Sequence, residues 1–252
     1  MQALVKLQDG CRPDLSVIIP ALDEAASIGT LLLGLRNNLG AGVELIVVDG
    51  GSNDATVSLA TPLCDQLIVT SRGRARQMHA GALQATGHRL WFVHADSSAL
   101  EPAAAWMLDD VKSSRNTAPV WGFFPVTMDS NSLSHRVIGT AMNTRSRLTG
   151  IGTGDQCLFV TRQLYQQAGG FAALELMEDI DICSRLRRLQ PPSLPPGHVR
   201  VQVSARRWQQ RGTVRTVLLM WWIRLAWFCG VSDKRLVQWY YPRAQRLDID
   251  RG

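Results

Sequence analysis

The stretch that decides the fold is Leu15-Ser16-Val17-Ile18-Ile19, followed at once by Pro20-Ala21-Leu22-Asp23-Glu24. Its first five residues form a short apolar run rich in β-branched residues, which is typical of a strand covered on both faces. A second run of this kind spans residues 43–48 and ends at Asp49-Gly50-Gly51-Ser52. Because a helical pattern follows each run, the alternation predicts parallel strands joined by right-handed crossovers.

The same alternation continues through the first half of the chain. It predicts strands at residues 66–69 and 89–93, and helices at residues 28–35, 74–86 and 102–113. A parallel sheet binds ligands beyond the carboxyl ends of its strands, and Asp23, Asp49 and Asp96 all stand at such ends. The fold class is therefore expected to be α/β, with a Rossmann-like, mainly parallel central sheet flanked by helices.

The pattern becomes less regular in the second half. Strands are expected at residues 120–127, 157–160 and 199–203, and helices at residues 133–148, 178–188 and 214–229. Residues 150–154 read as a flexible turn. The proline-rich residues 191–197 predict a stiff connector, because proline fixes φ and bars further helix.

Composition narrows the class of protein. A chain of 252 residues that is 46% hydrophobic can bury a substantial core. Its five cysteines show no CxxC pair or other metal-ligand spacing, and the N-terminus has no apolar signal-peptide core. We therefore expect a cytoplasmic protein with reduced thiols.

The net charge of +6 is concentrated in the C-terminal part, where residues 182–247 contain thirteen Arg or Lys residues against one acid, Asp233. Such asymmetry favours an anionic partner: a diphosphate, a phospholipid surface or nucleic acid. Nucleic acid is not expected as a partner, because the basic residues are interleaved with long apolar runs and no nucleic-acid-binding motif accompanies them.

A carboxylate cluster, Glu178-Asp179-Ile180-Asp181, opens the predicted helix at residues 178–188. Acidic side chains are favoured at a helix N-terminus by the helix dipole, so capping alone could explain them. Together with Asp49 and Asp96 at the strand ends, however, the cluster is also typical of a site for a metal and a nucleotide.

The most apolar segment, residues 214–228, contains Arg215 and Arg224. It is too short and too interrupted for a membrane span, which needs about 20 predominantly apolar residues. Tryptophans with flanking arginines suit an interfacial helix at a membrane surface, yet a helix that packs on a core has the same pattern. Both interpretations stay open.

Four motifs together resemble the inverting family 2 glycosyltransferases of the GT-A fold. They are the first strand and its loop (residues 16–24), the turn at residues 47–54, the His94-Ala95-Asp96 tripeptide and Glu178-Asp179. Three further runs, at residues 73–81, 154–156 and 204–208, resemble a bacterial subfamily often associated with radical-SAM and selenium-related gene neighbourhoods. The resemblance covers about residues 15–242 in the expected order.

The resemblance implies a nucleotide-sugar donor bound at the edge of the sheet. The residues expected to bind the nucleotide are Pro20, Ala21, Asp23, Glu24, Asp49, Gly50, Ser52, Arg74, Gln77 and Ala95. Among them Asp49 corresponds to the acceptor of a hydrogen bond from the base, and Arg74, at a helix start, is expected to contact the donor diphosphate. Capping of the following helix is the alternative for Asp23 and Glu24.

The resemblance also implies a metal and a base. Asp96 corresponds to the last aspartate of the family's DxD motif, which binds Mg²⁺ or Mn²⁺, whereas His94 departs from that motif. Asp179 corresponds to the general base that takes the proton of the acceptor hydroxyl, and Glu178 is expected to orient it or to touch the donor sugar. The sugar, the acceptor or the diphosphate is expected to contact Asp155, Gln156, Arg207 and Trp208.

The expected reaction is metal-dependent sugar transfer from a UDP- or GDP-linked donor to an unknown acceptor, with peripheral contact at the inner face of the membrane. A nucleotidyltransferase of similar fold and a nucleotide-sugar-binding protein with lapsed catalysis are the alternatives. A dehydrogenase is disfavoured because no GxGxxG follows the first strand. The expected organisation is a catalytic domain at residues 1–212, with a nucleotide-binding half at about 14–115 and a sugar and acceptor half at about 116–212, followed by an amphipathic helical extension at residues 213–252.

Overall fold

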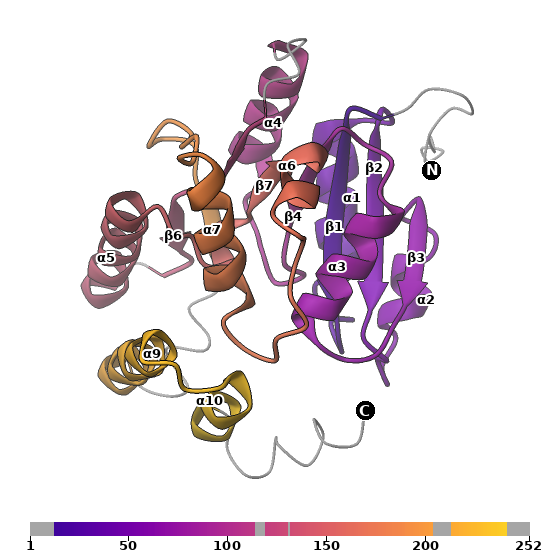
Figure 1. Ribbon diagram of the computed structural model, residues 1–252. Helices are drawn as coiled ribbons and strands as arrows, with labels where there is room; N and C mark the ends of the chain where they lie inside the picture. Colours follow the sequence, from indigo (N-terminus) through magenta and orange to yellow (C-terminus); the bar gives the residue numbers. More distant parts are fainter. Residues whose placement is uncertain (1–12, 114–118, 131, 204–212, 241–252) are drawn as a thin grey trace.

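The computed structural model describes residues 13–113, 119–130, 132–203 and 213–240. Its central sheet has six strands in the order β3-β2-β1-β4-β7-β5 (Figure 1). These strands are β1 (Leu15–Ala21), β2 (Val43–Asp49), β3 (Gln66–Val69), β4 (Arg89–Phe92), β5 (Trp121–Gly122) and β7 (Phe159–Thr161). A two-stranded sheet pairs β6 (Val126–Met128) with β8 (Val201–Val203).

Helices cover the central sheet. In chain order they are α1 (Ile28–Leu39), α2 (Thr56–Ala60), α3 (Arg74–Gln84), α4 (Glu101–Ser113), α5 (Leu133–Thr149), α6 (Arg162–Gln167), α7 (Glu178–Leu189), α9 (Thr213–Phe228) and α10 (Asp233–Tyr240), with a 3₁₀ turn, η1 (Gly154–Gln156). Residues of β1 alternate between two buried clusters. One cluster joins the sheet to α1 and α4, and the other joins it to α3, α6 and α7. This alternation explains why the strands are apolar throughout.

The parallel part of the sheet places the predicted site residues at one edge. β1 pairs in parallel with β2 and with β4, and the register sets Ala21 opposite Asp49 at the carboxyl ends. β2 pairs in parallel with β3. Only β7 is antiparallel to its neighbours, β4 and β5. The expected α/β class with a mainly parallel sheet is confirmed.

Helix α3 lies very close to the sheet because Gly81 has no side chain. A Cβ atom at this position would lie 2.5 Å from Cγ2 of Ile18 and 2.9 Å from Cγ2 of Val48. Neighbouring side chains essentially never approach so closely, so a larger residue would push α3 away from β1 and β2. This contact sets the distance between the sheet and the helix that begins at Arg74.

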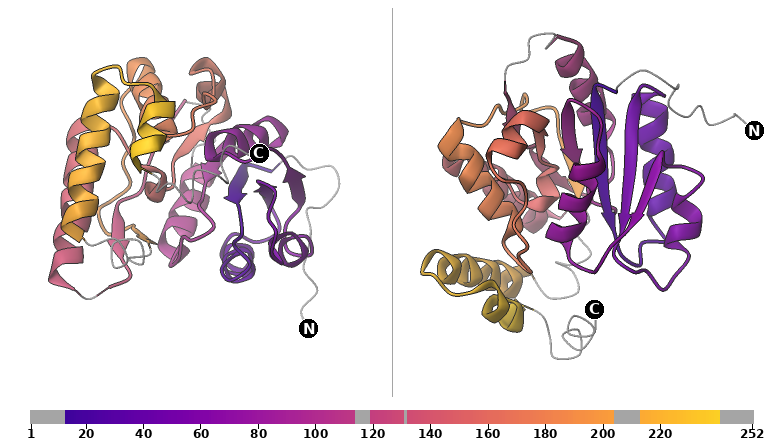
Figure 2. Two further views of the ribbon diagram at one scale, coloured as in Figure 1. Left: turned by 90° about the horizontal axis from the view of Figure 1, so that it is seen from below. Right: turned by 45° about the vertical axis from the view of Figure 1, so that its right-hand side comes forward.

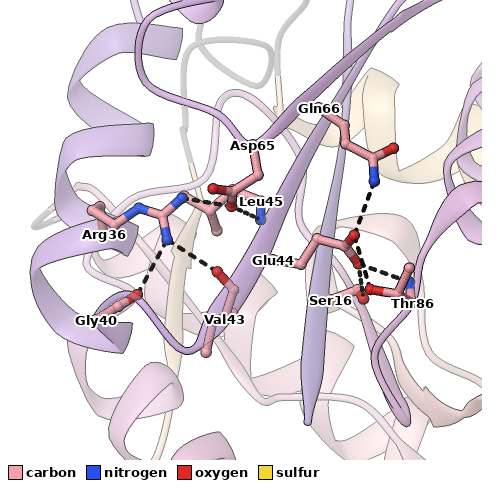
Figure 3. Close-up of polar contacts among 9 residues, drawn as sticks. All are labelled: Ser16, Arg36, Gly40, Val43, Glu44, Leu45, Asp65, Gln66 and Thr86. Atoms are coloured by element: carbon pink, nitrogen blue, oxygen red, sulfur yellow. Dashed lines mark hydrogen bonds and ion pairs between the residues drawn. The ribbon is translucent and has the colours of Figure 1, made fainter. Parts of the chain in front are cut away.

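Buried polar side chains hold together the opposite, amino-terminal edge of the sheet (Figure 3). Arg36 of α1 forms an ion pair of 2.6 Å with Asp65, and the same guanidinium donates to the carbonyl of Val43. The carboxylate of Glu44 accepts hydrogen bonds from the side chains of Ser16, Gln66 and Thr86. These partners pair the buried charges, as the low polarity of the interior requires, although Oδ1 of Asp65 accepts no hydrogen bond from the described residues.

Two expectations about the second half were wrong. The run at residues 120–127 is not one strand: β5 belongs to the central sheet, whereas β6 pairs with β8. Pro125 lies between them and lacks the N–H that a ladder needs, so the chain leaves the first sheet there. The strand expected at 157–160 begins later, at Phe159, because Cys157 has a left-handed backbone with φ of 47°.

The helix expected at residues 214–229 is confirmed as α9, which pairs with α10 (Figures 1 and 2). Ile223 and Leu236 are buried, but α9 also carries a row of exposed apolar residues, the α9 stripe: Leu218, Trp221, Trp222, Leu225 and Phe228. In the described part of the chain no helix combines the length and apolar character needed to cross a membrane. The boundary expected after residue 212 adjoins residues 204–212, which lie outside the described structure, so the division into domains stays a prediction.

Candidate active site

The loops after β1 and β2 are joined by hydrogen bonds into one polar cluster. Asp49 is buried, and its Oδ2 accepts the backbone N–H groups of Gly51 at 2.8 Å and Ser52 at 2.9 Å. The hydroxyl of Ser52 accepts the N–H of Asp23 at 2.9 Å, and Asp23 Oδ1 accepts the N–H of Asn53 at 2.8 Å. The structure therefore brings Asp23, Asp49 and Ser52 together at the predicted nucleotide edge.

Gln77, on α3, supports this edge of the sheet through hydrogen bonds. Its buried side chain donates through Nε2 to the carbonyls of Ala21 and Val48, both at 2.8 Å. A Cβ atom on Gly50 would lie 3.0 Å from that nitrogen, so the glycine allows the loop to lie on the amide. The side chain of Gln77 thus braces the carboxyl ends of β1 and β2, close to Pro20 within β1. Contact between Gln77 and a donor stays a prediction.

Glu24 occupies the start of the first crossover. Its backbone N–H donates to Oγ1 of Thr56 at 2.7 Å, and its carboxylate accepts the hydroxyl of Ser27, the N-cap residue of α1. These contacts tie Glu24 to the start of α1, and its role in nucleotide binding stays a prediction.

Helix α7 begins with the two predicted catalytic carboxylates. Glu178, its first residue, is 6% exposed, and its Oε1 lies 3.9 Å from Nη1 of Arg74, the first residue of α3. Burial, together with the neighbouring charge of Asp179, raises the pKa of Glu178 to about 7, whereas Arg74 acts in the opposite direction. Arg74 therefore links the predicted donor-binding half to helix α7. The raised pKa means that Glu178 keeps its proton up to about neutral pH.

Asp179 lies on the wall of a pocket with about 320 Å³ of empty volume. Its Oδ2 accepts the N–H of Gly154 at 2.9 Å, and its Oδ1 accepts the N–H of Ile180 at 2.7 Å. His94 is buried beside the same pocket, and a Cβ atom on Gly154 would lie 2.7 Å from His94 Cε1. The histidine thus packs beneath the turn that orients Asp179, which accounts for His94 without metal ligation.

Gln156 fixes the η1 turn from the other side. This residue is buried; its Oε1 accepts the hydroxyl of Ser146 at 2.7 Å and the N–H of Thr153 at 3.0 Å, and its Nε2 donates to the carbonyl of Phe124. Asp155, in the same turn, is partly exposed. Gln156 therefore anchors the turn to α5, while Asp155 keeps part of its surface in solvent.

Asp96 follows β4, after the buried Ala95, and its side chain is exposed at the carboxyl edge of the sheet. Burial raises the pKa of the Cys157 thiol, and the charges of both Asp155 and Asp96 raise it further, so both carboxylates lie near that sulfur. No group of three or more potential metal ligands occurs among the residues that are described. A hard cation that shares its shell with diphosphate oxygens and water needs only one or two carboxylates, so the exposed Asp96 fits that requirement.

Sequence reasoning missed two arginines near Asp179. Burial lowers the pKa of Arg145, on α5, to about 10, Arg224 acts in the same direction, and Asp179 and Asp155 oppose them. Burial also lowers the pKa of Arg224, on α9, and Asp179 again opposes it. The available signal was an arginine within the otherwise apolar run at residues 214–228. Two predicted residues, Arg207 and Trp208, lie outside the described structure.

Known proteins resemble both the sequence and the fold. A mannosyltransferase from Pyrobaculum calidifontis, solved with GDP-Man and Mn²⁺, superimposes with a TM-score of 0.57 at 21% identity, over 88% of this chain and 63% of that one. Glucosyl-3-phosphoglycerate synthase from Mycobacterium tuberculosis, solved with Mn²⁺, UDP and glucosyl-3-phosphoglycerate, gives a TM-score of 0.50 at 19% identity, over 76% and 70%. At such identities the likeness shows the fold alone, which is of the GT-A type.

Curated relatives match over shorter stretches. A PGL/p-HBAD biosynthesis glycosyltransferase of Mycobacterium bovis is 36% identical over 96 residues, which are 35% of this chain and 38% of the relative. A dolichyl-phosphate beta-glucosyltransferase of Drosophila melanogaster is 32% identical over 113 residues, 38% of this chain and 35% of the relative. The chain thus spans less than two fifths of the length of the curated relatives it matches.

The match to a protein family covers more of the chain than the match to either curated relative. The sequence model "Glycosyl transferase family 2" matches residues 16–165, which include β1, the polar cluster around Asp49, the carboxyl end of β4 and the η1 turn. Since this span covers more than half of the chain and contains the site edge described above, the protein belongs to glycosyl transferase family 2.

Proposed function

We propose that the protein is an inverting glycosyltransferase that moves a hexose from a UDP- or GDP-linked donor to an acceptor hydroxyl. The observation that carries the proposal is the position of Asp179, which is held by Gly154 at the wall of a pocket that His94, just after β4, also lines. Family membership supports the reaction class, and the solved GT-A proteins with GDP-Man or UDP support the donor class.

The chemistry requires a carboxylate opposite the leaving diphosphate. The acceptor oxygen attacks the anomeric carbon, the bond from that carbon to the diphosphate breaks, and Asp179 accepts the proton of the acceptor hydroxyl. Both oxygens of Asp179 accept backbone N–H groups, which keeps the side chain in one orientation. Glu178, buried against Arg74, orients its neighbour and changes the charge next to the reacting centre when it loses its proton.

The donor is held by the predicted nucleotide residues and by a cation. Asp23, Asp49 and Ser52 face the base and ribose, and Arg74 at the start of α3 is placed to reach the diphosphate. Mg²⁺ or Mn²⁺ held by Asp96, with Asp155 nearby, would neutralise the negative charge of the leaving diphosphate. Mn²⁺ in the solved GT-A structures supports this assignment.

The α9 stripe supports a membrane-proximal acceptor. Its residues recur at helical spacing, and Trp221 and Trp222 are 68% and 58% exposed. Trp239 of α10, 6.3 Å from Trp222 between ring centroids, extends the same apolar surface. Tryptophan suits the headgroup region of a bilayer, and the basic C-terminal part favours anionic lipids. The relative named for dolichyl phosphate supports a lipid-linked acceptor.

The proposal includes a cytoplasmic location with peripheral contact at the inner face of the membrane, and membership of the bacterial subfamily associated with radical-SAM and selenium-related genes. Both rest on sequence: the first on the cysteine usage and the basic C-terminal part, the second on the runs at residues 73–81, 154–156 and 204–208. Vesicle sedimentation tests the contact. Trp221→Ser with Trp222→Ser should release the protein from anionic vesicles, whereas Leu133→Ser, at an exposed apolar position of α5, should not.

Donor binding and hydrolysis test the reaction. In a thermal-shift panel of nucleoside diphosphates and nucleotide sugars, the correct donor should raise the melting temperature, and more so with Mn²⁺. Asp179→Asn should keep this shift and lose donor hydrolysis and transfer. Asp181→Asn is the matched control, because Asp181 lies on the same helix but forms an ion pair with Arg185.

The outcomes separate the proposal from its alternatives. Hydrolysis that survives in Asp179→Asn would remove the general base from the mechanism. Nucleotide binding without any turnover in the wild type would favour the binding protein with lapsed catalysis, and release of pyrophosphate from a nucleoside triphosphate would favour a nucleotidyltransferase.

A further inference from the structure

Two cationic side chains converge beside Asp179 from elements that the proposed reaction does not use. Arg145 comes from the last turns of α5, and Arg224 comes from α9, where it follows the buried Ile223. Both are half-buried. Arg224 adds to the lowering of the pKa of Arg145, and Asp179 opposes the lowering of the pKa of each arginine, so both guanidinium groups lie within electrostatic reach of Asp179.

The hydrogen-bonding capacity of this pair is largely unused. Arg145 donates through Nη2 to Ser146 Oγ at 2.9 Å, and its buried Nε has no partner. Within the described ranges, neither Arg145 nor Arg224 forms an ion pair with a carboxylate. A guanidinium group has five N–H donors, and burying one without an anionic partner is costly. A bound anion that is not part of the polypeptide would remove this cost.

The network around Arg145 connects it to the proposed base. Ser146, its hydrogen-bond partner, donates to Gln156 in η1, and Gly154 of the same turn donates to Asp179. An anion bound by Arg145 is therefore held in a defined position relative to Asp179. Such rigid positioning is what an acceptor needs if its hydroxyl is to lie within reach of the base.

The side of α7 on which Arg145 and Arg224 lie indicates which of the two substrates they contact. Figures 1 and 2 show α5 and α9 on the same side of the molecule, across α7 from β1, β2 and β3. The donor loops follow β1 and β2, on the other side of α7. Inversion requires the acceptor to attack from the face opposite the leaving diphosphate, so the arginine side is the acceptor side.

We propose, on the basis of the glycosyltransferase function above, that Arg145 and Arg224 bind a phosphate group of the acceptor. Planar guanidinium groups bind phosphate oxygens through paired hydrogen bonds, and two of them match a phosphate dianion. The phosphate can belong to a soluble molecule or to a lipid. Because α9 carries both the half-buried Arg224 and the exposed α9 stripe, the same helix suits both a bilayer and its headgroups.

Binding of a phosphate probe to the nucleotide-loaded protein tests this site. Wild-type protein saturated with its nucleoside diphosphate and Mn²⁺ is titrated calorimetrically with glycerol 3-phosphate and, separately, with glycerol. Phosphatidylcholine vesicles with and without phosphatidic acid provide the lipid arm. We expect the phosphate-bearing probe to bind and its neutral counterpart not to bind, and the tighter of the two arms identifies the source of the phosphate.

Variants assign the binding to the two arginines. Arg145→Gln and Arg224→Gln should each weaken phosphate binding by about tenfold or more, and Arg145→Lys, which keeps the charge and loses the planar fork, by less. Arg136→Gln on α5 and Arg235→Gln on α10 remove exposed arginines and should bind as the wild type does.

Nucleotide binding separates a failure of this inference from a failure of the proposed function. Each variant should keep the thermal shift caused by nucleoside diphosphate and Mn²⁺, which also shows that it is folded. Loss of that shift in the arginine variants would assign the pair to the donor diphosphate and overturn the proposal, as would phosphate binding that persists in both glutamine variants. A wild type that binds no nucleoside diphosphate would instead contradict the proposed function.

Discussion

The raised pKa of Glu178 makes a quantitative prediction about stability. In the unfolded chain this carboxyl group titrates near its ordinary value of 4.5, whereas in the folded protein burial raises its pKa to about 7. Between these values the folded state keeps a proton that the unfolded state releases. The free energy of unfolding must therefore fall as pH rises from about 4.5 to about 7, and it then stays at the lower level.

The size of the effect follows from the two pKa values. One pKa unit corresponds to about 1.4 kcal/mol, so the difference between 4.5 and about 7 corresponds to about 3 kcal/mol. Glutamine at this position keeps the shape and never ionises. Between about pH 5 and about pH 8 the wild type should lose roughly 2 to 3 kcal/mol relative to Glu178→Gln.

Urea unfolding followed by tryptophan fluorescence measures this difference, with the metal and nucleotide left out. Glu101→Gln is the matched control, because Glu101 is also the first residue of its helix, α4, but is exposed. Its stability difference from the wild type should change far less with pH. If the difference between wild type and Glu178→Gln were the same at both pH values, Glu178 would not be buried against Asp179 as described.

Three further substitutions test the packing and the site. Gly81→Ala should lower the free energy of unfolding by about 1–3 kcal/mol, because the new Cβ overlaps side chains of β1 and β2; urea unfolding measures it, and an unchanged midpoint would contradict the close approach of α3. Gly154→Ala should push the η1 turn off His94 and lower transfer by about a hundredfold, while nucleotide binding in the thermal-shift assay persists; equal activity would show that the turn does not orient the base. Arg36→Met leaves the buried Asp65 without its cation and should cost about 3–5 kcal/mol, whereas Arg76→Met, which breaks an exposed pair, should cost under about 1 kcal/mol; similar losses in the two urea titrations would refute the distinction.

Much of the fold followed from local pattern. Apolar runs such as residues 15–19 and 43–48, rich in β-branched residues and bounded by turn residues, are typical of strands buried on both faces, and the helical patterns after them predict parallel crossovers. The element that failed, the single strand expected at 120–127, is divided because Pro125 cannot join a ladder and because β8, far along the chain, offers β6 a different partner. Such pairing depends on contacts between distant segments, which no local pattern contains.

The features of the site likewise divide into those that the sequence alone predicted and those that only the tertiary structure decided. The sequence by itself determined that carboxylates would stand at the strand ends and at the start of α7, because the parallel sheet puts all these ends at one edge. Only the tertiary structure decided their chemical states and neighbours: Glu178 is buried against Arg74, His94 lies beneath Gly154, and Arg145 and Arg224 lie within electrostatic reach of Asp179. The physical reason is that burial and electrostatic interactions depend on distance in space, and the elements that create them are separated in the chain and brought together only by folding.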